Sequence, residues 1–155
     1  MHTYHGNFMW KVKAYLINLL KQDAYLITKI AGRVHSVHAS NLENPVFPFV
    51  TLTRQGVGGD PSFAELDYPF FVVDIWSKKG GQELWDIFAT KNPVSNKPAG
   101  VRALFTNKVF DLPEATIELI REVWVSDDLY ESWSRSHHIS ARYAVTVSAK
   151  TLVVP

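Results

Sequence analysis

The chain has 155 residues and no cysteine, and its 16 lysines and arginines nearly balance 15 aspartates and glutamates, which gives a formal net charge of +1. The absence of cysteine excludes disulfides, thiol nucleophiles and cysteine-bound metals. The balanced charge gives no electrostatic footprint for nucleic-acid binding through phosphates. No apolar run approaches the roughly 18 residues of a membrane span, and the first ten residues do not have the pattern of a signal peptide. We expect neither.

The content of 46% hydrophobic residues is enough for one core, so we predict a single domain over residues 1–155. Residues 1–7 are polar and are expected to be flexible, which leaves a core of about residues 8–150.

Two helices are predicted at the start of the chain. Apolar residues recur at helical spacing over residues 8–21. The stripe expected to face the core is Trp10, Ala14, Ile17 and Leu20. Asp23 is a candidate N-cap for a second helix over residues 24–31, which Gly32 ends. Its inward residues are expected to be Leu26, Ile27 and Ile30.

The rest of the chain predicts strands that cluster in hairpin-like pairs. The expected strands are 33–38, 48–55, 66–77, 117–126 and 139–147, with a helix at 82–90 and one or two helical turns at 101–106. Strict alternation places Leu119 and Arg121 on one face of strand 117–126, and Ile120 and Trp124 on the other. This order predicts an α+β fold, with a mostly antiparallel four- to five-stranded sheet and helices packed on one face.

The sequence offers few groups for catalysis or ligand binding. His35 and His38 are expected on a strand, where a spacing of three puts them on opposite faces and disfavours a shared metal. The glycine-rich segment 56–61 lacks the lysine and hydroxyl residue that close a phosphate loop. Asp74, in an apolar strand, is a candidate general base, but we expect it to face solvent or an assembly neighbour. We therefore predict no catalytic residue, no cofactor and no metal site.

Exposed aromatic residues among charges are typical of protein interfaces. Tyr130 and Trp133 lie in a polar segment, Trp124 is on the polar face of its strand, and Trp76 shares a face with Asp74. The glycine-rich segment suits a loop that orders against a partner. The candidate interface residues are Gly56, Gly58, Gly59, Asp60, Asp74, Trp76, Trp124, Tyr130, Trp133 and Arg135.

Four segments in this order resemble a known family. They are residues 31–35 after the leading helix, the proline-led strand 45–52, the strand end 73–77 (Val-Asp-Ile-Trp-Ser) with a helix directly after it, and residues 141–145 of the last strand. Over roughly residues 10–150 the pattern is similar to the tail completion proteins of long-tailed phages, small minor tail proteins related to tail terminators. Segment 91–116 is longer, and segment 127–138 more aromatic, than the family pattern.

The resemblance implies a structural virion protein of the tail and neck, assembled in the host cytoplasm, and not an enzyme. Such proteins form rings, commonly hexamers, that cap the tail tube and join it to the head-completion (connector) protein. The implied partners are other copies of the chain, the tail tube protein and the head-completion protein, with DNA only passing through the lumen and no membrane. Loops 56–65 and 127–138 are expected to supply ring contacts.

Three alternatives stay open from the sequence. The first is a head-side connector or stopper protein of similar size. The second is a small α+β ligand-binding or regulatory domain, with Asp74, Arg121 and Tyr143 as candidate ligand residues. The third is an enzyme with a histidine–carboxylate site assembled from distant segments.

Overall fold

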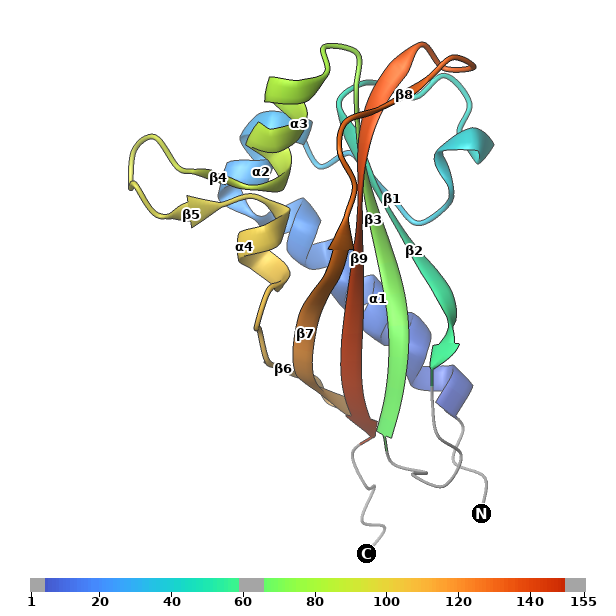
Figure 1. Ribbon diagram of the computed structural model, residues 1–155. Helices are drawn as coiled ribbons and strands as arrows, with labels where there is room; N and C mark the ends of the chain where they lie inside the picture. The colour runs from blue at the N-terminus through green and yellow to red at the C-terminus, as the bar shows by residue number, and fades with distance from the viewer. Residues whose placement is uncertain (1–4, 59–65, 150–155) are drawn as a thin grey trace, which may run out of the picture.

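The computed structural model describes residues 5–58 and 66–149, in which a curled sheet partly encloses four helices (Figure 1). The sheet contains β1 (Val34–His35), β2 (Phe49–Gly58), β3 (Leu66–Ser77), β6 (Phe110–Asp111), β7 (Ala115–Val125), β8 (Leu129–Glu131) and β9 (Ser136–Ala149). The helices are α1 (His5–Gln22), α2 (Ala24–Ile30), α3 (Gly81–Phe88) and α4 (Val101–Phe105), with a 3-10 helix η1 (Ala39–Asn41). A separate hairpin pairs β4 (Thr90–Lys91) with β5 (Pro98–Ala99).

Six of the seven strands of the main sheet follow the order β1-β2-β3-β9-β7-β6. The seventh, β8, pairs with the end of β9 that lies beyond β7. Strand β1 runs parallel to β2, whereas the other described pairs are antiparallel, so the sheet is mixed. The predicted α+β class is confirmed, but the prediction of four to five strands is too low. Strands β6 and β8 have only two and three residues, which is too short for an alternating pattern to show in the sequence.

Helix α1 buries a stripe that shares only Leu20 with the predicted one. It begins at His5 instead of residue 8, and its buried residues are Met9, Val12, Leu16 and Leu20. Trp10, which was expected in the core, is 62% exposed. Several rows of this helix are apolar, so helical periodicity alone cannot select one. Packing against β1, β2, β7 and α4 makes the selection.

Helix α2 has the predicted cap. The Asp23 carboxylate accepts a hydrogen bond from the Leu26 backbone N–H at 3.0 Å, which satisfies one of the free donors of the first turn. The helix ends at Ile30, because Ala31 and Gly32 both adopt the left-handed conformation. Ile27 is 47% exposed, so its predicted inward position is wrong.

Strand β3 is the centre of the sheet and is buried on both faces. On the face toward the helices, here called the inner face, Phe71, Val73 and Ile75 join one core with α1, α2, α3 and α4. The opposite face is called the outer face. At the end of β3, Ser77 Oγ donates to Glu83 Oε1 at 2.7 Å and accepts from the Lys79 backbone N–H at 2.9 Å. This hydroxyl thereby fixes the turn from β3 into α3.

Two β-bulges in β7 change which side chains face the core. The pairing with β9 shifts between Ile117 and Leu119 and again between Glu122 and Trp124. Each bulge adds one residue and reverses the alternation after it. Ile120 is therefore buried on the inner face, whereas Trp124 lies on the outer face, so their predicted common face is wrong. Leu119 and Arg121 do share one face, the outer one, where Leu119 is 40% exposed.

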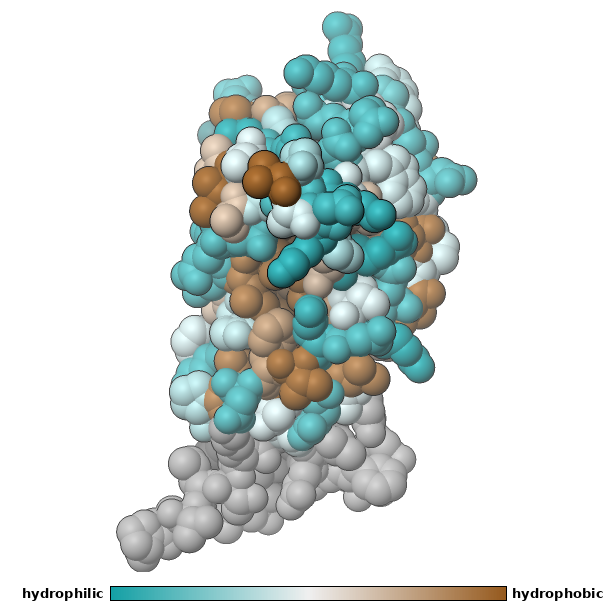
Figure 2. All heavy atoms as spheres, turned by 90° about the vertical axis from the view of Figure 1, so that its left-hand side faces the viewer, coloured by the Kyte–Doolittle hydropathy of each residue, from teal (hydrophilic) through white to brown (hydrophobic). Residues whose placement is uncertain are grey.

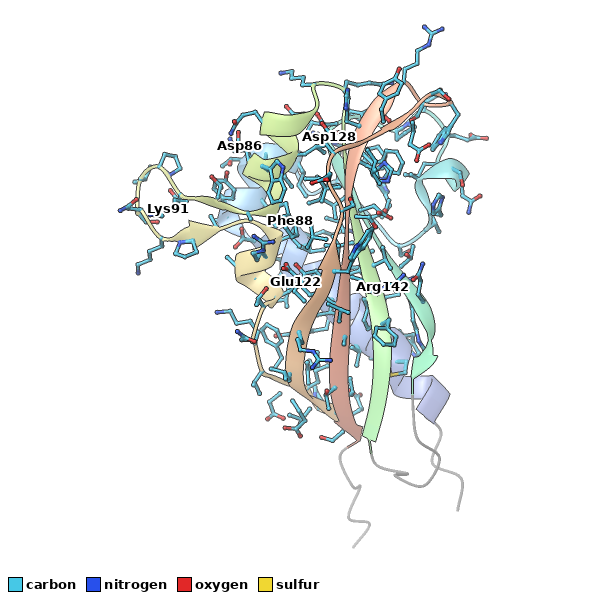
Figure 3. All side chains as sticks on the ribbon, viewed as in Figure 1. Asp86, Phe88, Lys91, Glu122, Asp128 and Arg142 are labelled. Carbon is cyan, nitrogen blue, oxygen red and sulfur yellow. The ribbon has the colours of Figure 1, made fainter. Side chains whose placement is uncertain are left out.

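Glu122 is a carboxylate on the inner face, and neighbouring groups neutralise it. Arg102 binds both of its oxygens, with Nε at 3.0 Å from Oε1 and Nη2 at 3.2 Å from Oε2. The buried Tyr143 hydroxyl donates to Oε1 at 3.2 Å. Burial is the largest effect on the Tyr143 phenol and raises its pKa, and the nearby charge of Glu122 raises this pKa further. Arg102 also lies 4.7 Å above the ring of Phe88. Phe88 and Glu122 are labelled close together in Figure 3.

The stripe that α1 buries can be tested by two substitutions of large apolar residues. We expect Leu16→Ala to lower the free energy of unfolding by about 2–5 kcal/mol, because it leaves a cavity in the main core. Trp10→Ala, at an exposed position of the same helix, should change it by less than about 0.5 kcal/mol. Urea unfolding followed by circular dichroism measures both, and equal losses would contradict the stripe.

Candidate interaction surfaces

The upper part of the outer face is covered, and it holds two of the predicted interface residues. Trp76 is 3% exposed and Asp74 is 8% exposed, so the expectation that Asp74 faces solvent is wrong. The Trp76 ring stacks on Phe49 and on His138, with centroid distances of 6.1 and 4.3 Å. Trp133, from the turn after β8, packs against the Trp76 ring in a T-shaped arrangement, with 5.8 Å between the ring centroids. The sequence could not show this cover, because it comes from segments far apart in the chain.

Asp74 lies in the middle of this covered region. Burial is the largest effect on its carboxyl group and raises its pKa above the ordinary value. A hydrogen bond with Ser140 and the nearby His138 and His38 act in the opposite direction but do not cancel the effect of burial. The ionised form of Asp74 is therefore disfavoured in the folded protein.

The remaining outer face, here called the open face, is uncovered in the described chain. It is formed by Leu119, Arg121, Trp124 and Arg142 over β7 and β9. Trp124 is 52% exposed and lies directly across the strand pair from Arg142. The Arg142 guanidinium reaches over β3 to Gln55, to whose Oε1 it donates at 3.1 Å (Figure 3). Among the described residues, neither of the two arginines has an ion-pair partner.

A third surface lies at the top of the molecule around β8. Residues 127–131, here called the acidic lobe, contain three carboxylates and the exposed side chains of Leu129 and Tyr130. Asp128 is hydrogen-bonded to His137 at 2.9 Å, whereas Asp127 has no ion-pair partner in the described chain. The turn that follows carries Arg135, which is exposed and has a φ of 49°.

Residues 91–98, here called the arm, project from the body of the protein as the β4–β5 hairpin (Figure 1). Val94 in its loop is 95% exposed, and Lys91 and Lys97 flank it. Lys91 points away from the sheet in Figure 3. This surface was not predicted from the sequence. The signal that was available is Asn92, because asparagine side chains commonly fold back on the backbone of turns.

The glycine-rich segment starts as a strand, although a loop was predicted there. Gly56 and Gly58 belong to β2, where Gly58 pairs with Tyr68 of β3 and a bulge falls between Gln55 and Val57. The predicted loop over residues 56–65 therefore includes strand residues at its start. Gly59 and Asp60 lie outside the described residues.

The structure does not bring together the residues proposed for a ligand site. Asp74 is buried on the outer face, Tyr143 is buried on the inner face, and Arg121 is exposed on the open face. His38 caps η1, accepting from the Ser40 backbone N–H at 3.2 Å, and His35 packs edge-on against Phe49. Within residues 5–58 and 66–149, no group of three histidines and carboxylates is placed to hold a metal ion.

Two grooves on the described surface are open to solvent. One lies between α2 and α3 and is lined by Lys29, Lys79, Gln82, Glu83, Asp86 and Ile87. The other lies beside the arm, where Tyr25, Leu104 and Phe110 form part of its wall. Seen from the side of the arm, hydrophilic residues surround separate hydrophobic patches (Figure 2). Neither groove has the concave apolar interior with a few convergent polar groups that is typical of small-molecule sites.

No protein-family model matches the sequence, and no curated protein matches it significantly. The helices in the described part of the chain do not combine the length and apolarity needed to cross a membrane.

Replacing Asp74 by asparagine tests the burial of its carboxyl group. Because the pKa of Asp74 is raised on folding, its contribution to stability is greatest below its unfolded pKa and falls as the pH rises through its folded pKa. We therefore expect Asp74→Asn to raise the melting temperature at pH 7, and the difference from the wild type to shrink toward pH 3. Calorimetry across this range measures it, and a difference independent of pH would contradict the assignment.

Proposed function

We propose that this protein is a structural virion component, a tail terminator or completion protein of a long-tailed phage. In this role a ring of its copies, which we propose to be a hexamer, caps the tail tube and joins it to the head-completion protein. The proposal builds on the resemblance of the four sequence segments to that family. It needs no catalytic residue or cofactor of the chain.

The observation that best supports this proposal is that large aromatic side chains are exposed on several separate faces of one small domain. Trp10 lies on α1, Trp124 on the open face, and Tyr130 and Trp133 around the acidic lobe, each at least half exposed. Exposed aromatic residues are common anchors of protein interfaces. A ring subunit at a joint must contact two neighbouring copies and two further proteins, which requires several such faces on each copy.

The open face illustrates the kind of contact that we infer. Leu119 and Trp124 offer apolar area, and Arg121 and Arg142 border it with positive charge. Aromatic and arginine side chains are both enriched at protein interfaces and at their energetic centres. A partner that supplies apolar and acidic groups would bury the indole and pair with the guanidinium groups.

The proposal is tested first by assembly. We expect the purified protein to form rings of about six copies, either alone or on tubes polymerised from the tail tube protein. Light scattering measures the mass in solution, and negative-stain microscopy shows rings at tube ends. In addition, tubes should stop growing when the protein is added. A protein that stays monomeric and neither binds tubes nor limits their length would contradict the proposal.

The open face can be tested within the same assay. We expect Trp124→Ala to reduce binding to tubes by about 30-fold, which corresponds to the roughly 2 kcal/mol typical of an interface anchor. Its thermal stability should change little, because the side chain is half exposed. The matched control is Val109→Ala, at a residue that is 62% exposed elsewhere and should bind as the wild type does. Equal binding by both variants would show that the open face is not used in assembly.

A further inference from the structure

The arm has a fixed conformation although it projects into solvent. The Asn92 backbone N–H donates to Lys97 O at 2.8 Å, and the Asn96 N–H donates to Asn92 O at 2.8 Å. The Asn92 side chain accepts from the Val94 N–H at 2.9 Å, and Asn96 takes a φ of 59° to close the loop. A segment that is already ordered loses little conformational entropy when it docks. The arm therefore has the properties of a preformed binding element.

The chemistry of the arm defines what it can bind. Its fully exposed apolar residue, Val94, is flanked by two exposed lysines, Lys91 and Lys97, and residues 91–98 contain no acid. Neither lysine has an ion-pair partner among the described residues. A complementary surface would offer apolar side chains next to carboxylates.

The acidic lobe of the same chain has this complementary chemistry. Leu129 and Tyr130 are 41% and 59% exposed, and Asp127 and Glu131 lie on either side of them in the sequence. Four basic groups lie near the lobe. His137 pairs with Asp128 at 2.9 Å and His138 lies 3.9 Å from Glu131, whereas Arg135 and Lys78 lie at the far end of the turn, where Lys78 Nζ donates to Ser134 O. At the end of the lobe next to β7, Asp127 has no ion-pair partner in the described chain and is free to accept a basic partner.

The placement of the two elements favours a contact between copies. The arm projects from one side of the upper half of the molecule, beside α3 and α4, whereas β8 lies along the end of β9 at the top of the sheet (Figure 1). Two different surfaces that meet between copies make a heterologous contact, which closes into a ring when the rotation permits.

We propose that the arm of one copy docks on the acidic lobe of the next copy, with Val94 against Tyr130 and the two lysines near Asp127 and Glu131. The inference rests on the proposed function for the ring, but the contact can be tested without the tube. In this contact each copy uses its arm once and its lobe once.

Disulfide cross-linking is a direct test, because the natural chain has no cysteine. We expect the double variant Val94→Cys with Tyr130→Cys to give a ladder of covalent multimers on oxidation, seen by denaturing electrophoresis without reductant. Each single variant should remain monomeric. An equal mixture of the two single variants should give dimers and nothing larger, which is the signature of a heterologous contact. Both positions are exposed, and thermal unfolding checks that the variants fold.

The matched control replaces the lobe position by an equally accessible apolar residue. Val94→Cys with Leu119→Cys should give no ladder, because Leu119 is 40% exposed on the open face and not on the lobe. The charges of the arm and of the lobe are tested by further substitutions in the Val94→Cys with Tyr130→Cys double variant. Lys91→Glu with Lys97→Glu should slow ladder formation by about tenfold or more, and adding Asp127→Lys with Glu131→Lys should restore it.

The proposed contact is overturned if the Val94 and Tyr130 pair stays monomeric, if the Leu119 control gives the same ladder, or if charge reversal leaves the rate unchanged. The virion role is judged separately by tube capping. A ladder without tube binding would retain the contact and reject the role, whereas capped tubes without a ladder would reject only the contact.

Discussion

Burial of β3 on both faces is the constraint on which the other elements depend. From Phe71 to Ser77 every residue of this strand is buried, although the sheet is only partly backed by helices. Side chains on the inner face are buried by α1, α3 and α4, whereas Trp76 on the outer face is buried by η1, the loop that follows it, and the turn after β8. Strand β9 connects these two layers, because it pairs with β3, β7 and β8.

The same constraint accounts for the polar groups in the interior. Glu122 faces the core because a bulge sets its direction, and Arg102 together with Tyr143 compensates its charge. Burying a carboxylate with a bidentate arginine and a hydroxyl is tolerated, whereas an unpaired one is not. Asp74, on the other face, has weaker compensation, and burial therefore raises its pKa.

The surface is divided between a covered region and elements that extend from the body. The open face, the acidic lobe and the arm lie on different sides of the domain and do not converge on one cavity. This distribution suits the proposed role, in which the interaction energy of a subunit is spread over several neighbours. Among the described residues, these groups do not line one concave site of the kind typical of ligand-binding domains.

The long strands, the α+β class and the Asp23 cap were predictable from the sequence, because they depend on local alternation and on one side chain near one backbone donor. The aromatic residues Trp124, Tyr130 and Trp133 were likewise identified as exposed among charges. Three features depend on tertiary structure: the buried stripe of α1, the faces of β7, and the cover over Asp74 and Trp76. A stripe among several apolar rows is chosen by packing, and a bulge depends on the paired strand. Burial on the outer face comes from η1 and the turn after β8, which are distant in sequence.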